Sequence, residues 1–329
     1  MTKNVSRSSA AMRYLYPAAF LVLIAGAFGL ANTVQAADVR HQEGEHLKPT
    51  GRGTGEQDPS GLTEQHALRF GPLSTNGISY HGGPVILGTV NLYYIWYGSW
   101  DFSSDATDDS KTKAILNTFG SQIGGTPYFN INTTYFDSTN AAVSGAVGFS
   151  ALNNAIVPAS PGTILSDSAV QDIVTNALTT GALLPDEHGV YFVLTSKDVR
   201  ENSGFCTQYC AWHGYGTINK QNIKFGFVGN PMQCPAACSA QTNTPNGNQA
   251  ADAMANLIGH ELAEATTDPN LNAWYDRSGQ ENADKCAWAF GSTKPGPNGS
   301  RYNVTFGGLN WLLQRNWINK SGGFCTLTR

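Results

Sequence analysis

Charged side chains are scarce in this chain. Lysine, arginine, aspartate and glutamate make up 13% of the 329 residues, whereas 36 residues are glycine. Such a composition is more typical of a loop-rich extracellular protein than of a cytosolic one. Acidic residues also outnumber basic residues, by 24 to 20. This balance argues against nucleic acid or an anionic membrane surface as the main partner.

Several common functional motifs are absent. The sequence has no P-loop and no G-x-G-x-x-G between a predicted strand and a predicted helix, and these motifs mark phosphate and dinucleotide binding. It also has no G-x-S-x-G, the motif that carries the serine nucleophile of many hydrolases. A glycosidase mechanism with two catalytic carboxylates remains an alternative. Any two acidic residues could serve, and a sequence does not give the distance between them.

Cysteine is absent from the first 205 residues. In an exported protein the six cysteines are expected to form three disulfides, with fifteen pairings open. Two C-x-x-x-C spacings also suggest a four-thiolate zinc site, although their flanking residues do not resemble a zinc ribbon. The six are Cys206, Cys210, Cys234, Cys238, Cys286 and Cys325.

The N-terminus predicts export. Basic residues precede an apolar run over residues 18–31, and Val34-Gln-Ala36 follows it. This pattern predicts a secretory signal peptide over residues 1–36. The run is too short for a good membrane anchor, and an uncleaved anchor is the alternative. Cleavage leaves 17 basic and 24 acidic residues, a formal charge of −7. We expect a secreted protein, or a periplasmic one if a Gram-negative cell retains it, with no membrane contact after cleavage.

The rest of the chain divides into two parts. Residues 37–78 are polar and lack periodicity, so we expect a flexible linker or propeptide with solvated His41, His46 and His66. Residues 79–329 are expected to form one α/β or α+β domain with a mixed sheet and a disulfide-stapled C-terminal half. Predicted strands cover residues 85–97, 189–196, 223–229, 302–306 and 310–317, and predicted helices cover residues 110–123, 167–178 and 249–267.

The strongest motif is His260-Glu-Leu-Ala-Glu264 in the last of these helices. It matches the zinc-hydrolase helix H-E-x-x-H with glutamate in place of the second histidine. Four residues apart on a helix, His260 and Glu264 share one face and can bind one cation. Glu261 beside them is the candidate general base. Without a cation, His260 would be a core histidine and Glu264 would pair with Arg277 or Arg315.

A catalytic zinc site needs a third protein ligand and an open position. Glu281 is the predicted third ligand, and Asp284 would orient a ligand from the second shell. Asp268 is the second choice for the third ligand. Positions i, i+4 and i+8 of a straight helix span about 12 Å, so the chain must bend near Pro269 to bring Asp268 close to the same ion. This layout resembles the glutamate-type zinc peptidases. Two carboxylates and one imidazole favour Zn²⁺, with Ca²⁺ or Mn²⁺ as alternatives.

Two further histidines stand near glycines. His213, in Cys-Ala-Trp-His-Gly-Tyr-Gly, is expected on a loop. There it would stabilise an oxyanion or donate a proton, or else be an ordinary hydrogen-bonded loop histidine. His81, in Tyr-His-Gly-Gly-Pro, is expected to be structural.

Four ordered blocks, within residues 80–100, 194–214, 228–238 and 260–286, resemble the EXORDIUM or phosphate-induced protein family. They include Tyr-His-Gly-Gly-Pro-Val, Gly-Phe-Cys-Thr-Gln-Tyr-Cys-Ala-Trp-His-Gly and His-Glu-Leu-Ala-Glu-Ala-Thr-Thr-Asp-Pro. The resemblance covers roughly residues 78–327. It implies an extracellular protein, linked in plants to growth and cell expansion, without a settled biochemical activity. The alanine-rich export signal suggests a bacterial member.

The motif helix and the resemblance together give two hypotheses. The first is a secreted, zincin-like metal-dependent hydrolase, a peptidase in the first place, that acts on an extracellular peptide or glycan. His260, Glu264 and Glu281 would bind the metal, Glu261 would activate water, and His213 would assist. The second is a non-catalytic, cell-wall-associated binding or growth-signalling protein in which the same residues hold a structural ion.

Overall fold

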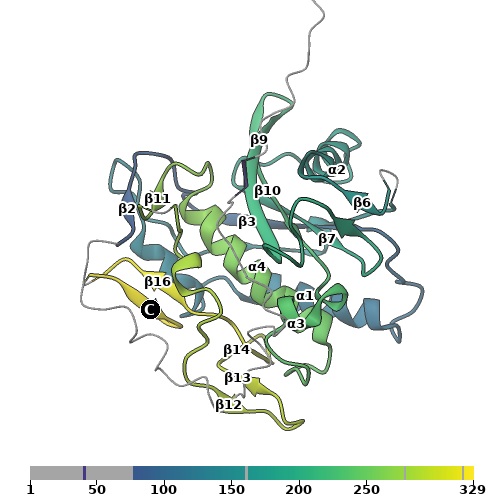
Figure 1. The fold of residues 1–329 in the computed structure, drawn as a ribbon. Coiled ribbons are helices and arrows are strands. Elements are labelled where there is room, and N and C mark those ends of the chain that lie inside the picture. The colour runs from purple at the N-terminus through teal and green to yellow at the C-terminus, as the bar shows by residue number, and fades with distance from the viewer. Residues whose placement is uncertain (1–39, 42–76, 160–161, 278, 321) are drawn as a thin grey trace, which may run out of the picture. The chain divides into compact units, whose positions relative to one another are not determined.

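The computed structural model describes residues 40–41, 77–159, 162–277, 279–320 and 322–329 (Figure 1). The predicted signal peptide and most of the predicted polar linker lie outside these ranges. No helix within them is both long and apolar enough to span a membrane.

Seven strands of the described residues form one mixed sheet, as predicted. Its order is β1-β9-β10-β7-β3-β4, and β5 also pairs with β3. The pairs β10–β7, β7–β3, β3–β4 and β3–β5 are parallel, whereas β9 is antiparallel to both β10 and β1. The strands are β1 (Arg40–His41), β3 (Val90–Tyr97), β4 (Val147–Gly148), β5 (Asn154–Val157), β7 (Gly189–Thr195), β9 (Ala211–Ile218) and β10 (Gln221–Val228).

The central strands are apolar because both of their faces are covered. Every residue of β7, Gly-Val-Tyr-Phe-Val-Leu-Thr, is buried, and a strand in that position is a continuous apolar run. The predicted strand over residues 85–97 is too long, because β3 begins only at Val90. The N–H of Ile86 instead donates to the carbonyl of Thr266, at 3.0 Å. This segment is therefore tied to the end of a helix rather than to the sheet.

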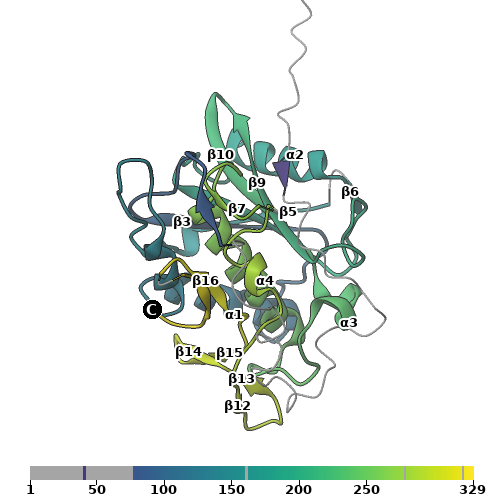
Figure 2. The ribbon, with the colours of Figure 1, turned by 60° about the vertical axis from the view of Figure 1, so that its left-hand side comes forward.

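The longest helix, α4 (Gln249–Thr267), covers one face of the sheet (Figure 1 and Figure 2). It packs against β9, β10 and α1 (Asp108–Gln122), and its residues from Ala251 onward are all buried. Asn248 caps its N-terminus by accepting the N–H of Ala251, at 2.9 Å. On the other face of the sheet lies α2 (Asp167–Thr179). The three predicted helices are confirmed, with ends shifted by at most two residues.

Short strands and turns make up the rest of the described chain. The two last predicted strands are divided by turns into β13, β14, β15 and β16. Small two-stranded sheets pair β2 with β11, β6 with β8, β12 with β13, β14 with β15 and β16 with β17. These elements are β2 (Ser79–Tyr80), β6 (Ile164–Leu165), β8 (Arg200–Glu201), β11 (Trp274–Tyr275), β12 (Lys294–Pro295), β13 (Arg301–Tyr302), β14 (Val304–Phe306), β15 (Leu309–Trp311), β16 (Asn316–Ile318), β17 (Phe324–Thr326), α3 (Pro235–Cys238) and the 3-10 helices η3 (Phe129–Thr134), η4 (Ala151–Asn153), η5 (Pro231–Gln233) and η6 (Asp284–Cys286).

All six cysteines lie in the described part of the chain and are paired, so the three predicted disulfides are confirmed. Two of the bonds join the two C-x-x-x-C segments to each other. The alternative of a four-thiolate zinc site is therefore wrong. The pairs are Cys206–Cys234, Cys210–Cys238 and Cys286–Cys325.

Removal of the Cys286–Cys325 bond should destabilise the fold. The two residues are 39 apart in sequence, and the loss of this constraint on the unfolded chain lowers the free energy of unfolding by about 4 kcal/mol. Denaturant unfolding of C286A/C325A measures the loss. The matched variant C206A/C234A, with a separation of 28 residues, should lose a similar amount. A loss below about 1 kcal/mol in both would contradict the entropic account.

Candidate metal centre

The motif residues lie on the C-terminal half of α4. His260 and Glu264 stand one turn apart, and Nε2 of His260 is 3.1 Å from Oε1 of Glu264. Both residues and Glu261 are at most 1% exposed. Aspartate and glutamate are almost never fully buried unless they are paired. This half of α4 therefore brings one imidazole and two carboxylates into the interior, where each needs a partner.

The segment after α4 supplies two more carboxylates. Oδ1 of Asp284, at the start of η6, is 3.4 Å from Nε2 of His260. Its Oδ2 accepts the N–H of Glu281, at 3.1 Å, and its own N–H donates to Oε1 of Glu264, at 3.0 Å. These backbone hydrogen bonds fix the carboxylate, so Asp284 lies beside the pair formed by His260 and Glu264. The sequence had assigned that position to Glu281.

His213 lies on strand β9, so the prediction of a loop is wrong. It stands opposite Gly226 of β10 in the antiparallel ladder. Glycines at 214 and 216 suggested a loop, but here they are residues of strand β9, which packs against α4. Nε2 of His213 is 3.0 Å from Oε2 of Glu281 and 3.7 Å from Oε2 of Glu264. The packing of α4 on β9 thus joins His213 to the motif helix.

Gln314 is a site residue that no sequence motif marks. Its side-chain amide contacts Nδ1 of His260, so Nε2 is the ring nitrogen that faces the carboxylates. The backbone N–H of Gln314 donates to Oδ1 of Asn256, at 2.8 Å. The side-chain Oε1 of Gln314 accepts the backbone N–H of Trp288, at 3.2 Å. Such contacts orient a histidine for ligation. Only the fold could reveal Gln314, because it lies 54 residues from His260.

The cluster is strongly acidic. Burial raises the pKa of Glu281 well above its usual value, and the neighbouring carboxylates raise it further. Within the described residues, Oε1 of Glu281 has no hydrogen-bond partner although the residue is 1% exposed. Burial of such a group is costly unless it is compensated. A cation at this position would therefore stabilise the cluster. The neighbouring carboxylates are Asp268, Glu264, Asp284 and Glu261.

The distances fit metal ligation. Ligands at about 2.0–2.1 Å from a tetrahedral zinc ion lie about 3.3–3.4 Å apart. The distances of 3.1 Å and 3.4 Å from His260 Nε2 to Glu264 and Asp284 are close to that value. Apart from the disulfide-bonded cysteines at 206, 234 and 238, two sets of three described residues bring their ligand atoms within 4.8 Å of one another. The sets are His260, Glu264 and Asp284, and His213, Glu261 and Glu264.

The arginine alternative for Glu264 does not match the geometry. The ion pairs described for Glu264 are with His260 and His213. Arg277 is exposed, and the Nε–H of Arg315 donates to the carbonyl of Ala289, at 3.3 Å. A carboxylate between two imidazoles is an arrangement suited to a cation.

Asp268, the runner-up ligand, ends α4 instead. Its Oδ1 accepts the N–H groups of Asn272 and Ala273, both at 2.6 Å. Burial raises the pKa of Asp268 to about 6, against the opposing effect of these hydrogen bonds. The nearby His81 is exposed and stacks on the ring of Tyr275, with 3.7 Å between ring centroids. Asp268 and His81 thus stabilise the turn that follows α4.

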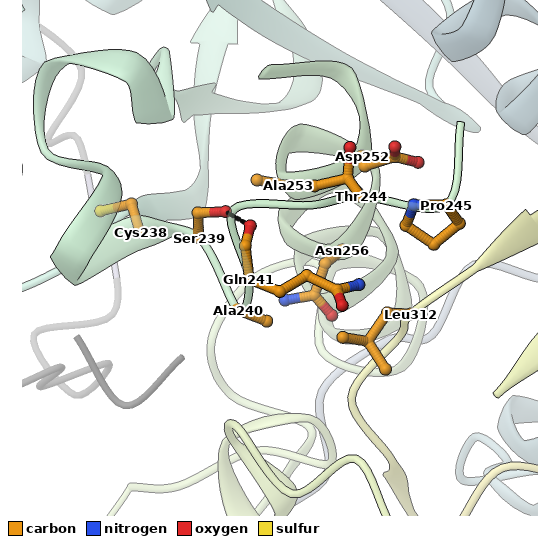
Figure 3. Close-up of a pocket in the computed structure, with 10 residues that line it drawn as sticks. All are labelled: Cys238, Ser239, Ala240, Gln241, Thr244, Pro245, Asp252, Ala253, Asn256 and Leu312. Atoms are coloured by element: carbon orange, nitrogen blue, oxygen red, sulfur yellow. Dashed lines mark hydrogen bonds between the residues drawn. The ribbon is translucent and has the colours of Figure 1, made fainter. Parts of the chain in front are cut away.

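A small pocket lies further back along α4, apart from this cluster (Figure 3). Its carboxylate, Asp252, already accepts the N–H of Asn246, at 2.9 Å. Neither of the two described sets of histidine and carboxylate ligands includes a residue of this pocket, and its one cysteine, Cys238, is disulfide-bonded. We therefore assign the chemistry to the buried cluster. The pocket is lined by Cys238, Ser239, Ala240, Gln241, Thr244, Pro245, Asp252, Ala253, Asn256 and Leu312.

Comparison with known proteins gives a family and no structural relative. The phosphate-induced protein 1 conserved region matches residues 78–303. Protein EXORDIUM-like 3 of Arabidopsis thaliana is 27% identical over 280 residues, 76% of this chain and 82% of the relative. Protein EXORDIUM-like 5 of the same plant is 28% identical over 297 residues, 79% of this chain and 80% of the relative. No solved structure matches this chain significantly.

Replacement of Asp268 by asparagine should raise stability at neutral pH. In the unfolded chain the carboxyl of Asp268 has a pKa near 4. In the folded protein burial raises this pKa to about 6. The wild-type free energy of unfolding therefore falls by up to about 3 kcal/mol between pH 4 and pH 7 relative to D268N. Thermal or denaturant unfolding at both pH values measures this. If D268N instead loses stability and bound metal at pH 7, Asp268 is a ligand.

Proposed function

This chain belongs to the phosphate-induced protein 1 family, and on that premise we propose that it is an exported, zincin-like metal-dependent hydrolase with peptidase activity. The three disulfides support a site of action outside the cytoplasm. That site is extracellular, or periplasmic if a Gram-negative cell retains the protein. The alanine-rich N-terminus supports a bacterial source for this member of the family.

The observation that carries the proposal is the grouping of His260, Glu264 and Asp284 around one point in the interior. One imidazole and two carboxylates are suitable ligands for Zn²⁺, and Mn²⁺ or Ca²⁺ are the alternatives. A bound zinc ion lowers the pKa of a coordinated water and polarises a carbonyl group. The backbone hydrogen bonds on Asp284 and the Gln314 contact on His260 hold two of the three ligands in position.

The remaining residues of the cluster supply proton transfer. Glu261 follows His260 directly, and its carboxylate lies within 4.8 Å of the ligand atoms of His213 and Glu264. It accepts the proton of the attacking water. His213, whose Nε2 is 3.0 Å from Glu281, donates a proton or stabilises negative charge on the substrate.

An extended peptide is the substrate that the sheet favours. The short strand β1 adds to β9 in antiparallel fashion, with His41 opposite Gly214 and Arg40 opposite Tyr215. A backbone segment can therefore pair with this strand next to His213. Strand addition of this kind is a common mode of peptide recognition.

A second candidate is a non-catalytic, cell-wall-associated binding or growth-signalling protein. The deep burial of the cluster favours it, because His213 and His260 show no exposed surface and Glu281 is 1% exposed. A closed site with no open ligand position is typical of a structural ion. The ion would then stabilise the fold without turnover.

The variant E261Q separates the two candidates. It keeps the shape of the side chain but removes the proton acceptor, so peptide hydrolysis should fall by about 10²–10⁴-fold while metal at His260, Glu264 and Asp284 is retained. Metal content by elemental analysis and cleavage of a peptide library are the two measurements. The exposed Glu187 gives the matched control, E187Q, which should behave as the wild type.

Two results would decide against the hydrolase. A wild-type protein that binds no metal contradicts both candidates in their metal-dependent form. Metal that is retained, with stability lost on chelation and no hydrolysis of any peptide or glycan, leaves the structural ion.

A further inference from the structure

We propose that the centre binds two cations and that Glu264 bridges them. This inference rests on the proposed metal site and specifies how many ions it holds. The first cation is held by His260, Glu264 and Asp284. The second is held by His213, Glu261 and the other oxygen of Glu264.

The two histidines stand too far apart to bind the same ion. Two ligands of a single ion lie at most about 4.2 Å apart when each bond is about 2.1 Å. Among the described residues, no set of ligand atoms within 4.8 Å of one another contains both His213 and His260. The two sets share only Glu264. One ion therefore reaches one histidine, and the second histidine belongs to a second ion.

The two oxygens of Glu264 point to different histidines. Oε1 is 3.1 Å from Nε2 of His260, and Oε2 is 3.7 Å from Nε2 of His213. A carboxylate can bind two ions in this way, whereas a histidine offers one side of its ring to one ion. Paired metal sites with ions about 3.5–4 Å apart are common in hydrolases. This geometry accounts for glutamate at the place of the second histidine in the motif helix.

Glu281 offers the second cation a further oxygen ligand. Oε2 of Glu281 is 3.0 Å from Nε2 of His213, and its Oε1 has no hydrogen-bond partner among the described residues. Glu281 is 1% exposed, so water does not replace that partner readily. A cation beside His213 satisfies this carboxylate.

The charge balance favours two ions over one. In their ionised forms, the four buried carboxylates at 261, 264, 281 and 284 carry a formal charge of −4. One divalent cation leaves −2, and two leave 0. Uncompensated charge in the interior is strongly unfavourable. Glu261 binds the second ion through one oxygen and keeps the other as the proton acceptor.

Mn²⁺ binding to the full-length exported protein tests the inference. We expect two Mn²⁺ per chain by elemental analysis and an exchange-coupled electron paramagnetic resonance spectrum, because the ions lie about 3.5–4 Å apart. The variant H213A should bind one Mn²⁺ and give the uncoupled spectrum of an isolated ion. E261Q, which preserves side-chain shape, should do the same and serves if H213A fails to fold.

The matched control is H188A, which removes an exposed histidine and should bind two coupled ions. One Mn²⁺ per chain in the wild type, lost in H260A and kept in H213A, overturns the second ion and leaves the proposed function intact. Two ions in both H213A and E261Q overturn this ligand assignment. No Mn²⁺ or Zn²⁺ in the wild type overturns the proposed function as well.

Discussion

The structure depends on the compensation of negative charge in the interior beneath β9. Glu261, Glu264, Glu281 and Asp284 are all buried there, beside two imidazoles. Removal of carboxylates from water costs several kcal/mol for each one unless hydrogen bonds or cations replace the water. Backbone N–H groups satisfy part of this requirement at Glu264 and Asp284. At Glu281 the requirement is only partly met, because its buried Oε1 has no hydrogen-bond partner among the described residues.

Covalent bonds hold the segments that carry these groups. Cys210 is three residues before His213, and its disulfide ties the start of β9 to Cys238. Cys286 is two residues after Asp284, and its bond to Cys325 anchors the turn of η6. Segments with little regular structure are otherwise the most mobile parts of a fold. The disulfides thus fix the positions of the residues in the cluster and also stabilise the folded chain.

A bridging Glu264 gives a physical meaning to the departure from H-E-x-x-H. In a site with one ion, a second carboxylate weakens water activation, because it lowers the positive charge available to the water. In a site with two ions, the same carboxylate joins the ions and offsets their repulsion. The names of the plant relatives, EXORDIUM-like 3 and EXORDIUM-like 5, state no chemistry. Its buried histidines and carboxylates are therefore the most direct guide to what this chain does.

The sequence by itself determined the elements with strong local signals. A helix-like apolar run predicted α4, apolar runs predicted β3 and β7, and the cysteine count predicted the number of disulfides. It also singled out His260, Glu264, Glu281 and Asp284. Only the tertiary structure decided that His213 is a strand residue facing Glu264, that Asp284 lies nearer to His260 than the sequence indicated, and that Gln314 contacts His260. These contacts join segments tens of residues apart, and packing of α4 on β9 fixes them, whereas sequence spacing constrains only neighbours on one helix or strand.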